Sequence, residues 1–137
     1  MGVIIQDEYL VANASYLRLL SEYDKYGSIE VAFDFDNTVY DFHKKGVSYY
    51  QMIQLLKDLK SIGCNLTCFT ANEDDAFIKK FLEDNRIPFD RINENPSFFV
   101  SNSRKIYFNA LLDDRAGLIQ VYQELNLLVQ TVKNRKT

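Results

Sequence analysis

Two spacings of apolar residues alternate along this chain. Apolar side chains three or four positions apart are typical of helices, and short unbroken apolar runs are typical of strands buried on both faces. The helical spacing covers residues 7–26, residues 47–62, the segment from Asn72 to just before Ile87, and the segment from about Arg115 onward. Short, mainly apolar runs cover residues 29–35, Cys64–Thr70 and Tyr107–Leu112. This alternation of strand and helix predicts an α/β fold, a three-layer, Rossmann-like parallel sheet with helices on both faces.

The expected helices differ in how clearly their ends are marked. Residues 47–62 carry one apolar stripe, and a glycine follows at once as a stop signal. An acidic first turn at residues 73–75 favours a helix that starts at Asn72. Residues 89–104 show no regular pattern. Beyond Asn126 the pattern leaves open a continued helix or an added edge element.

Length and composition indicate a single domain, residues 1–137. Hydrophobic residues make up 47% of the chain and charged residues 26%, as in ordinary globular domains. The chain has no apolar run of transmembrane length, and its first residues lack the pattern of a secretory signal. We therefore expect a cytoplasmic protein with no membrane partner. A net charge of −3 makes nucleic acid an unlikely partner, because phosphates are bound by clustered Lys and Arg.

The two cysteines, Cys64 and Cys68, lie in one expected strand. Four positions apart in a strand, they would be about 13 Å from each other, which is too far for a disulfide. Their spacing is not that of a zinc pair, and His43 is the only histidine in the chain. We expect both to be reduced cysteines in the core.

Polar side chains follow each of the expected strands. Asp34 and Asp36 close the first strand, Thr70 closes the second, and the pair Asp113–Asp114 closes the third. Because the carboxyl ends of parallel strands meet at one edge of a sheet, these side chains are expected to share a small pocket. Carboxylates so close together repel each other unless a cation joins them, and oxygen ligands without Cys or His suit Mg²⁺.

Such a pocket suits a phosphoryl group. A metal ion and a lysine neutralise its charge while a threonine hydroxyl donates a hydrogen bond, and Lys105 lies just before the third strand. One carboxylate beside the metal can attack phosphorus to form an aspartyl phosphate. A second carboxylate two residues on can protonate the leaving oxygen and then activate water.

In this order, the residues resemble the four motifs of the haloacid dehalogenase superfamily of phosphohydrolases. The matching stretches are Val31–Val39, Leu66–Thr70, Lys105 and Ala110–Asp114. The resemblance spans residues 29–125, the expected catalytic core, and leaves the helix at 7–26 in front of it. The family inserts cap domains at the places that correspond to residues 39–69 and 71–104, and both segments are too short to hold one. The chain therefore resembles a small capless member, whose site is open to large substrates or closed by a second subunit in a homo-oligomer.

The resemblance implies a role for each matching residue. Asp34 would be the nucleophile and a Mg²⁺ ligand. Asp36 would be the general acid and base, with its backbone carbonyl on the metal. Thr70, with Ala71 beside it, would bind the phosphoryl oxygens, and Lys105 would orient the nucleophile and offset charge.

The fourth motif would complete the metal site. Asp113 would be a further Mg²⁺ ligand, and Asp114 would act on the metal directly or through water. The function implied is a Mg²⁺-dependent phosphatase that hydrolyses phosphomonoesters, with a phosphorylated small molecule or macromolecule as substrate. An acid at the Asp36 position is the phosphatase type of the family and argues against its transport-ATPase branch.

A second class of function stays open, namely a non-catalytic module that binds a phosphorylated ligand or regulates a partner on the same fold. A receiver-like signalling domain fits poorly, because its phosphoacceptor Asp should end the middle strand, and here that strand runs into Phe69–Asn72 without an Asp. The loop Tyr40–Gly46 follows the first motif and holds His43. Its histidine is either solvated or in contact with substrate.

Overall fold

A computed structural model describes residues 7–135 of the chain. Within them, four parallel strands form one sheet in the order β3-β2-β1-β4. The strands are β1 (Glu30–Phe33), β2 (Asn65–Cys68), β3 (Arg91–Ile92) and β4 (Ala110–Leu112). The central strand β1 pairs with β2 on one side and with β4 on the other, so that Val31 lies opposite both Leu66 and Ala110.

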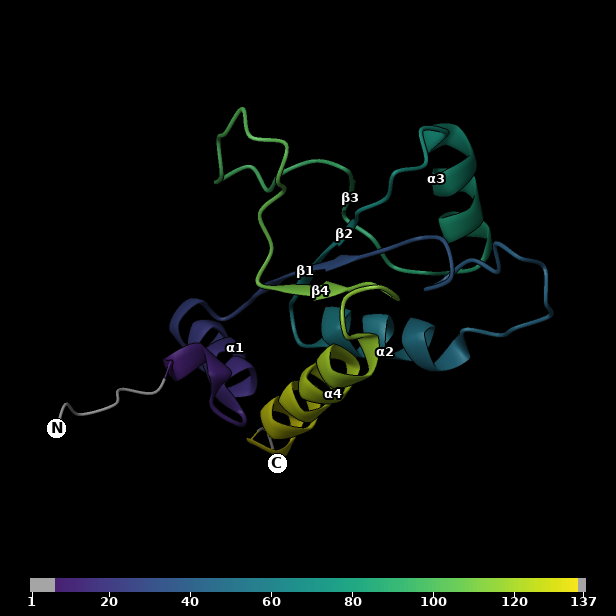
Figure 1. The fold of residues 1–137 in the computed structure, drawn as a ribbon. Helices are drawn as coiled ribbons and strands as arrows, with labels where there is room; N and C mark the ends of the chain where they lie inside the picture. Colours follow the sequence, from purple (N-terminus) through teal and green to yellow (C-terminus); the bar gives the residue numbers. More distant parts are fainter. Residues whose placement is uncertain (1–6, 136–137) are drawn as a thin grey trace, which may run out of the picture.

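Within the described residues, four helices flank this sheet. They are α1 (Ala14–Tyr26), α2 (Tyr50–Ser61), α3 (Asp75–Asp84) and α4 (Leu118–Arg135), and a short 3₁₀ helix, η1 (Glu8–Leu10), precedes α1. Figure 1 shows α2 and α4 beside each other, with α1 near the C-terminal end of α4. The predicted α/β, Rossmann-like arrangement is confirmed. None of the helices within the described residues is long and apolar enough to cross a membrane.

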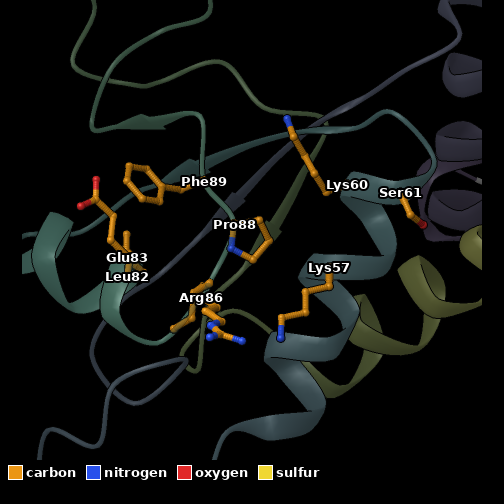
Figure 2. A pocket seen from close by; sticks show the side chains of 9 residues that line it. Lys57, Lys60, Ser61, Leu82, Glu83, Arg86, Pro88 and Phe89 are labelled. Atoms are coloured by element: carbon orange, nitrogen blue, oxygen red, sulfur yellow. The ribbon is translucent and has the colours of Figure 1, made fainter.

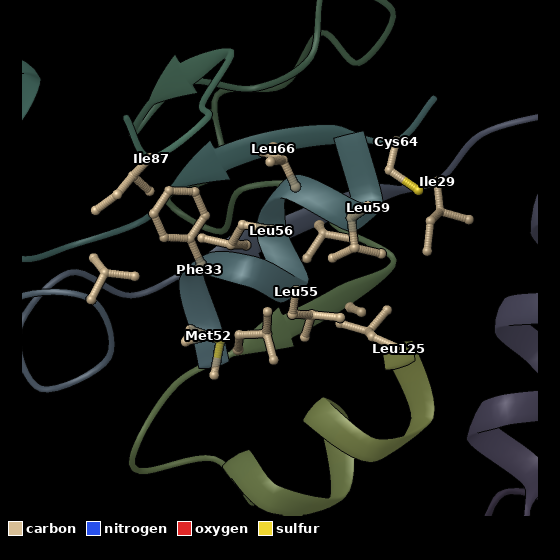
Figure 3. Packing of buried hydrophobic residues seen from close by; sticks show 14 of the residues in the cluster. Ile29, Phe33, Met52, Leu55, Leu56, Leu59, Cys64, Leu66, Ile87 and Leu125 are labelled. Atoms are coloured by element: carbon tan, nitrogen blue, oxygen red, sulfur yellow. The ribbon is translucent and has the colours of Figure 1, made fainter. Parts of the chain in front are cut away.

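The main core lies between the sheet and helix α2. Figure 3 shows Phe33 and Leu66 of the sheet packed with the leucines of α2, and Leu125 of α4 closing the lower side. The predicted α2 stripe is buried throughout, at Met52, Leu55, Leu56, Leu59 and Ile62. Burying a side chain of this size contributes about 1.5–3 kcal/mol, so this stripe fixes α2 on the sheet.

The first helix differs from the prediction of one helix over residues 7–26. Asn13 adopts a left-handed backbone conformation (φ 66°) and separates η1 from α1. Tyr9 and Leu10 are 72% and 78% exposed, so their helical spacing does not reflect core packing. The Asp7 side chain accepts a hydrogen bond from the Tyr9 N–H and starts η1 instead.

Helix α3 starts later than predicted. The Asp74 side chain accepts a hydrogen bond from the Phe77 N–H and forms the N-cap. Asn72, the predicted start, lies in a turn before it, where its side chain accepts a hydrogen bond from the Asp74 N–H. An acidic run contains several possible caps, and the pattern alone does not decide among them.

The last strand is shorter than predicted, and the last helix is longer than the pattern established. The Tyr107 N–H bonds the Asn95 side chain rather than a neighbouring strand, so pairing begins only at Ala110.

Strand β3, within the segment that showed no pattern, is only two residues long. Beyond Asn126 the chain continues as helix α4, which buries Leu128, Val129 and Val132.

Both cysteines are confirmed as buried free thiols. Burial raises the pKa of Cys64 to about 11 and that of Cys68 to about 12. Neither thiol forms thiolate at neutral pH, so both act as small apolar core residues.

Candidate functional site

The carboxylates that follow β1 and β4 meet where these two strands end. Phe33 and Leu112 are paired in register, and the Asp34 N–H donates a hydrogen bond to the Leu112 carbonyl at 2.8 Å. This pairing sets Asp34 beside Asp113 and Asp114. One carboxylate oxygen from each of these three residues lies within 4.8 Å of the other two. The structure thus brings together three of the four residues that the sequence assigned to a metal.

A cleft of about 520 Å³ opens over these carboxylates. Its lining residues are Asp34, Asp36, Asn37, Phe42, His43, Phe69, Thr70, Ala71, Asp113, Asp114 and Arg115. Every predicted site residue except Lys105 is in this set. A hollow of similar volume, about 540 Å³, lies between α2 and α3 (Figure 2), but its lining has Glu83 as its one carboxylate and offers no comparable ligand set.

The proximity of the carboxylates has a clear electrostatic effect on Asp34. Burial, the neighbouring Asp113 charge and a hydrogen bond with Asp114 raise the pKa of Asp34 to about 7, against the opposing effect of the Phe35 N–H. A group shifted in this way holds a proton that a bound cation would replace. Three carboxylates on two adjacent strand ends form an oxygen-only donor set, which fits Mg²⁺.

Asp36 lies in a tight loop that leaves part of its side chain without a partner. The Phe35 carbonyl accepts hydrogen bonds from the Val39 and Tyr40 N–H groups, and Asn37 is left-handed with φ 62°. Burial and the Asp114 charge raise the pKa of Asp36. Its Oδ1 is buried and has no hydrogen-bond partner among the described residues. The loop therefore leaves this carboxyl oxygen unpaired in a group that also lines the cleft.

Thr70 is fixed by a residue that the sequence pattern did not single out. The Asn93 side chain, just after β3, accepts a hydrogen bond from the Thr70 N–H at 2.8 Å. The Thr70 hydroxyl accepts one from the Asn72 N–H at 3.1 Å, which leaves its own hydrogen free to donate. Asn93 lies in the segment without a regular pattern, so no sequence signal pointed to it.

The structure does not bring Lys105 to the cleft. Lys105 is exposed, and its N–H bonds the Ser103 hydroxyl in the long connection between β3 and β4. Arg115, the arginine that follows the acidic pair, lines the cleft instead. Its backbone N–H donates a hydrogen bond to the Asp113 side chain at 3.0 Å. The adjacency of Arg115 to the fourth motif is a signal that sequence reasoning could have used.

The loop that carries His43 is held in place at its base. Slight desolvation would raise the pKa of Asp41, but the backbone N–H groups of residues 45–47 bond its carboxylate and lower the pKa below its usual value. Gly46 is left-handed with φ 80°, a backbone conformation that glycine adopts without steric cost. His43 and its neighbour Phe42 both line the cleft.

Comparisons with known proteins add the fold alone. No protein-family model and no curated protein matches this chain. Among solved structures, the chain is similar to a conserved protein from Bacteroides thetaiotaomicron, with a TM-score of 0.58 and 20% sequence identity. The match covers 80% of this chain and 93% of that one. At this identity the likeness shows a shared fold and carries nothing about the site.

Proposed function

We propose that the chain is a Mg²⁺-dependent phosphatase that hydrolyses phosphomonoesters through an aspartyl phosphate. The observation that carries this proposal is the meeting of Asp34, Asp113 and Asp114 at two adjacent strand ends. Asp36 and Thr70 line the same cleft. The order of these residues along the chain also resembles the motifs of the haloacid dehalogenase superfamily.

Each of these residues would have a distinct part in the reaction. An Asp34 carboxylate oxygen forms a bond to phosphorus as the bond to the leaving oxygen breaks, and Asp36 gives that oxygen its proton. Asp36 then takes a proton from water, which attacks phosphorus and frees Asp34 with release of inorganic phosphate. The Thr70 hydroxyl donates to a phosphoryl oxygen throughout. Mg²⁺ bound by Asp34, Asp113 and Asp114 would offset the negative charge of the phosphoryl group.

A positive side chain completes such a site, and two candidates exist. Lys105 fits the motif order but is outside the cleft, whereas Arg115 lines the cleft beside the acidic pair. The position of Arg115 supports it as the charge that meets the phosphoryl group. A role for Lys105 requires the β3–β4 connection to change its path.

The test is phosphate release from a generic aryl phosphate, with and without Mg²⁺. We expect release by the wild type only with Mg²⁺ and a loss of at least about a thousandfold in Asp34→Asn, because the nucleophile is removed. Asp75→Asn is the matched control, since Asp75 is an exposed acid on α3 outside the cleft. Release by Asp34→Asn at the wild-type rate would contradict the proposal.

A phospho-ligand-binding module without turnover is the second candidate. The position of Lys105 outside the cleft favours it, because a charge that the resemblance assigns to catalysis is not beside the nucleophile. Such a module would show Mg²⁺-dependent binding of inorganic phosphate, for example by calorimetry, and no phosphate release from any ester. The cytoplasmic location and a second copy of the chain over the cleft stay predictions.

A further inference from the structure

The wall of the cleft carries aromatic side chains that the proposed chemistry does not use. Phe42, His43 and Phe69 line the cleft together with the carboxylates. Phe42 is 55% exposed, although it is a large apolar side chain. Its described ring contact is with His43, at 5.1 Å between ring centroids and 77° between ring planes. About half of Phe42 therefore remains uncovered where it lines the cleft.

The exposure of Phe42 does not come from a loosely held loop. Two residues before it, Tyr40 is stacked on Phe35 at 5.0 Å and meets Phe81 edge to face at 5.0 Å between ring centroids. Asp41, directly before Phe42, accepts hydrogen bonds from the backbone N–H groups of residues 45–47, which follow Phe42. The packing of Tyr40 and the hydrogen bonds of Asp41 across Phe42 restrict the backbone that carries this ring, which lowers the entropy cost of binding another ring against it.

The depth of the groups in the cleft limits what that ring can meet. The nucleophile Asp34 is half-buried at the end of β1, whereas Phe42 is 55% exposed on the loop that follows. With the phosphate over Asp34, a ring bonded directly to the leaving oxygen would lie beside Asp36, the general acid of the proposed reaction. A ring joined to the phosphate through a sugar would reach further along the lining, to the exposed side chains of Phe42 and His43.

The geometry points to a nucleoside monophosphate as the substrate class, with its base against Phe42 and His43 and its phosphate over Asp34. This assignment rests on the phosphatase proposal for the position of the phosphate. Stacking of a base on an aromatic side chain tolerates any base, because every base has a π face. The wall therefore selects nucleotides over simple sugar phosphates and does not select among bases.

The test compares two ligands that differ at C1 of the ribose, which carries the base in one and a hydroxyl group in the other. Binding of a nucleoside 5′-monophosphate and of ribose 5-phosphate is measured by calorimetry with Mg²⁺ in the Asp34→Asn variant, whose amide prevents turnover and keeps one side-chain oxygen for the metal. We expect the nucleotide to bind about tenfold more tightly or better. Phe42→Ala, made in the same background, should remove most of that difference and leave the affinity for ribose 5-phosphate unchanged, while Phe42→Tyr should preserve it.

Phe98→Ala is the matched control, because Phe98 is also an exposed aromatic residue, at 66%, but lies outside the cleft against Tyr107. It should leave the preference intact. Equal affinity for both ligands, a preference that survives Phe42→Ala, or tighter binding of an aryl phosphate than of the nucleotide would each overturn the inference.

The two proposals fail in different ways. If the wild type hydrolyses ribose 5-phosphate and shows no preference in binding, the proposed base site is wrong and the phosphatase proposal stands. If a tenfold preference depends on Phe42 but no ester is hydrolysed, the phosphatase proposal is wrong and the nucleotide site stands. No binding of either ligand overturns the nucleotide site.

Discussion

Asp34 carries an electrostatic cost in the metal-free protein that can be measured. Its pKa is raised from 3.8 to about 7, first by burial and then by Asp113 and Asp114. The folded state thus keeps a proton that the unfolded chain loses from about pH 4 upward. The contribution of this proton to the free energy of unfolding is fully present below about pH 4 and is lost as pH rises through about 7.

Replacing Asp34 by Asn should therefore stabilise the metal-free protein at neutral pH. We expect a gain of about 1–2 kcal/mol near pH 8, since one pKa unit is about 1.4 kcal/mol and solvent at the cleft screens part of it. Near pH 4 the two proteins should be equally stable. Urea unfolding with a chelator at several pH values measures this, and an Asn variant that is less stable than the wild type near pH 8 would speak against the carboxylate cluster.

The two candidate cations can be separated by one pair of variants. Arg115 lines the cleft and Lys105 does not, so Arg115→Ala should raise KM for a phosphomonoester about tenfold or more, the usual effect of losing a charge-assisted hydrogen bond. Lys105→Ala should change kcat/KM less than about twofold. The reverse order of effects would restore the role that the motif order implies for Lys105.

Sequence reasoning located the site residues that end strands and missed those held by long connections. Asp34, Asp36 and Asp113 follow apolar runs, and parallel pairing alone brings such residues together. Lys105 and Asn93 lie in or beside the irregular segment between β3 and β4, whose path depends on side-chain hydrogen bonds rather than on apolar spacing. Such hydrogen bonds leave no periodic pattern in the sequence, so the sequence could not predict where either residue lies relative to the cleft.

At the scale of elements, the N-cap of α3 offers a sharp test of local structure. Asp74 and Asp75 are adjacent acids, and only the Asp74 side chain accepts a hydrogen bond from the Phe77 N–H, at 3.1 Å. Asp74→Ala should destabilise the protein by about 1 kcal/mol, and Asp75→Ala by no more than about half of that. Denaturant unfolding measures both, and equal effects would mean that general charge near the helix start matters more than the cap.

Elements with buried stripes were predictable, and elements without them were not. The apolar stripe of α2 is buried from Met52 to Ile62, so the helical spacing of these residues correctly indicated which side chains pack in the core. The apolar residues before Asn13 have the same spacing but are exposed, so the same pattern there gave a wrong helix. Strand β3 consists of two residues, which is too few for any period to show.

At the scale of the whole molecule, α4 links parts of the fold that are far apart in sequence. It packs against both α1 and α2, and the Ser15 hydroxyl of α1 bonds Glu124 of α4. Its first residues follow the acidic pair and Arg115 closely, so α4 also holds the end of β4 where the site lies. The C-terminal half of α4, which the sequence left undecided, is therefore part of what stabilises the fold.

A pair of adjacent leucines in that half tests this view. Leu128 is fully buried, whereas Leu127 is 50% exposed, although both lie in the same turn of α4. Leu128→Ala should cost about 2–5 kcal/mol through lost burial and a cavity, and Leu127→Ala less than about 0.5 kcal/mol. Because Leu128 does not line the cleft, kcat measured well below the unfolding transition should stay at the wild-type value in both variants. Equal stabilities for the two variants would mean that this half of α4 does not pack on the core. A fall in kcat for Leu128→Ala in the fully folded state would mean that the packing of α4 also sets the geometry of the acidic pair.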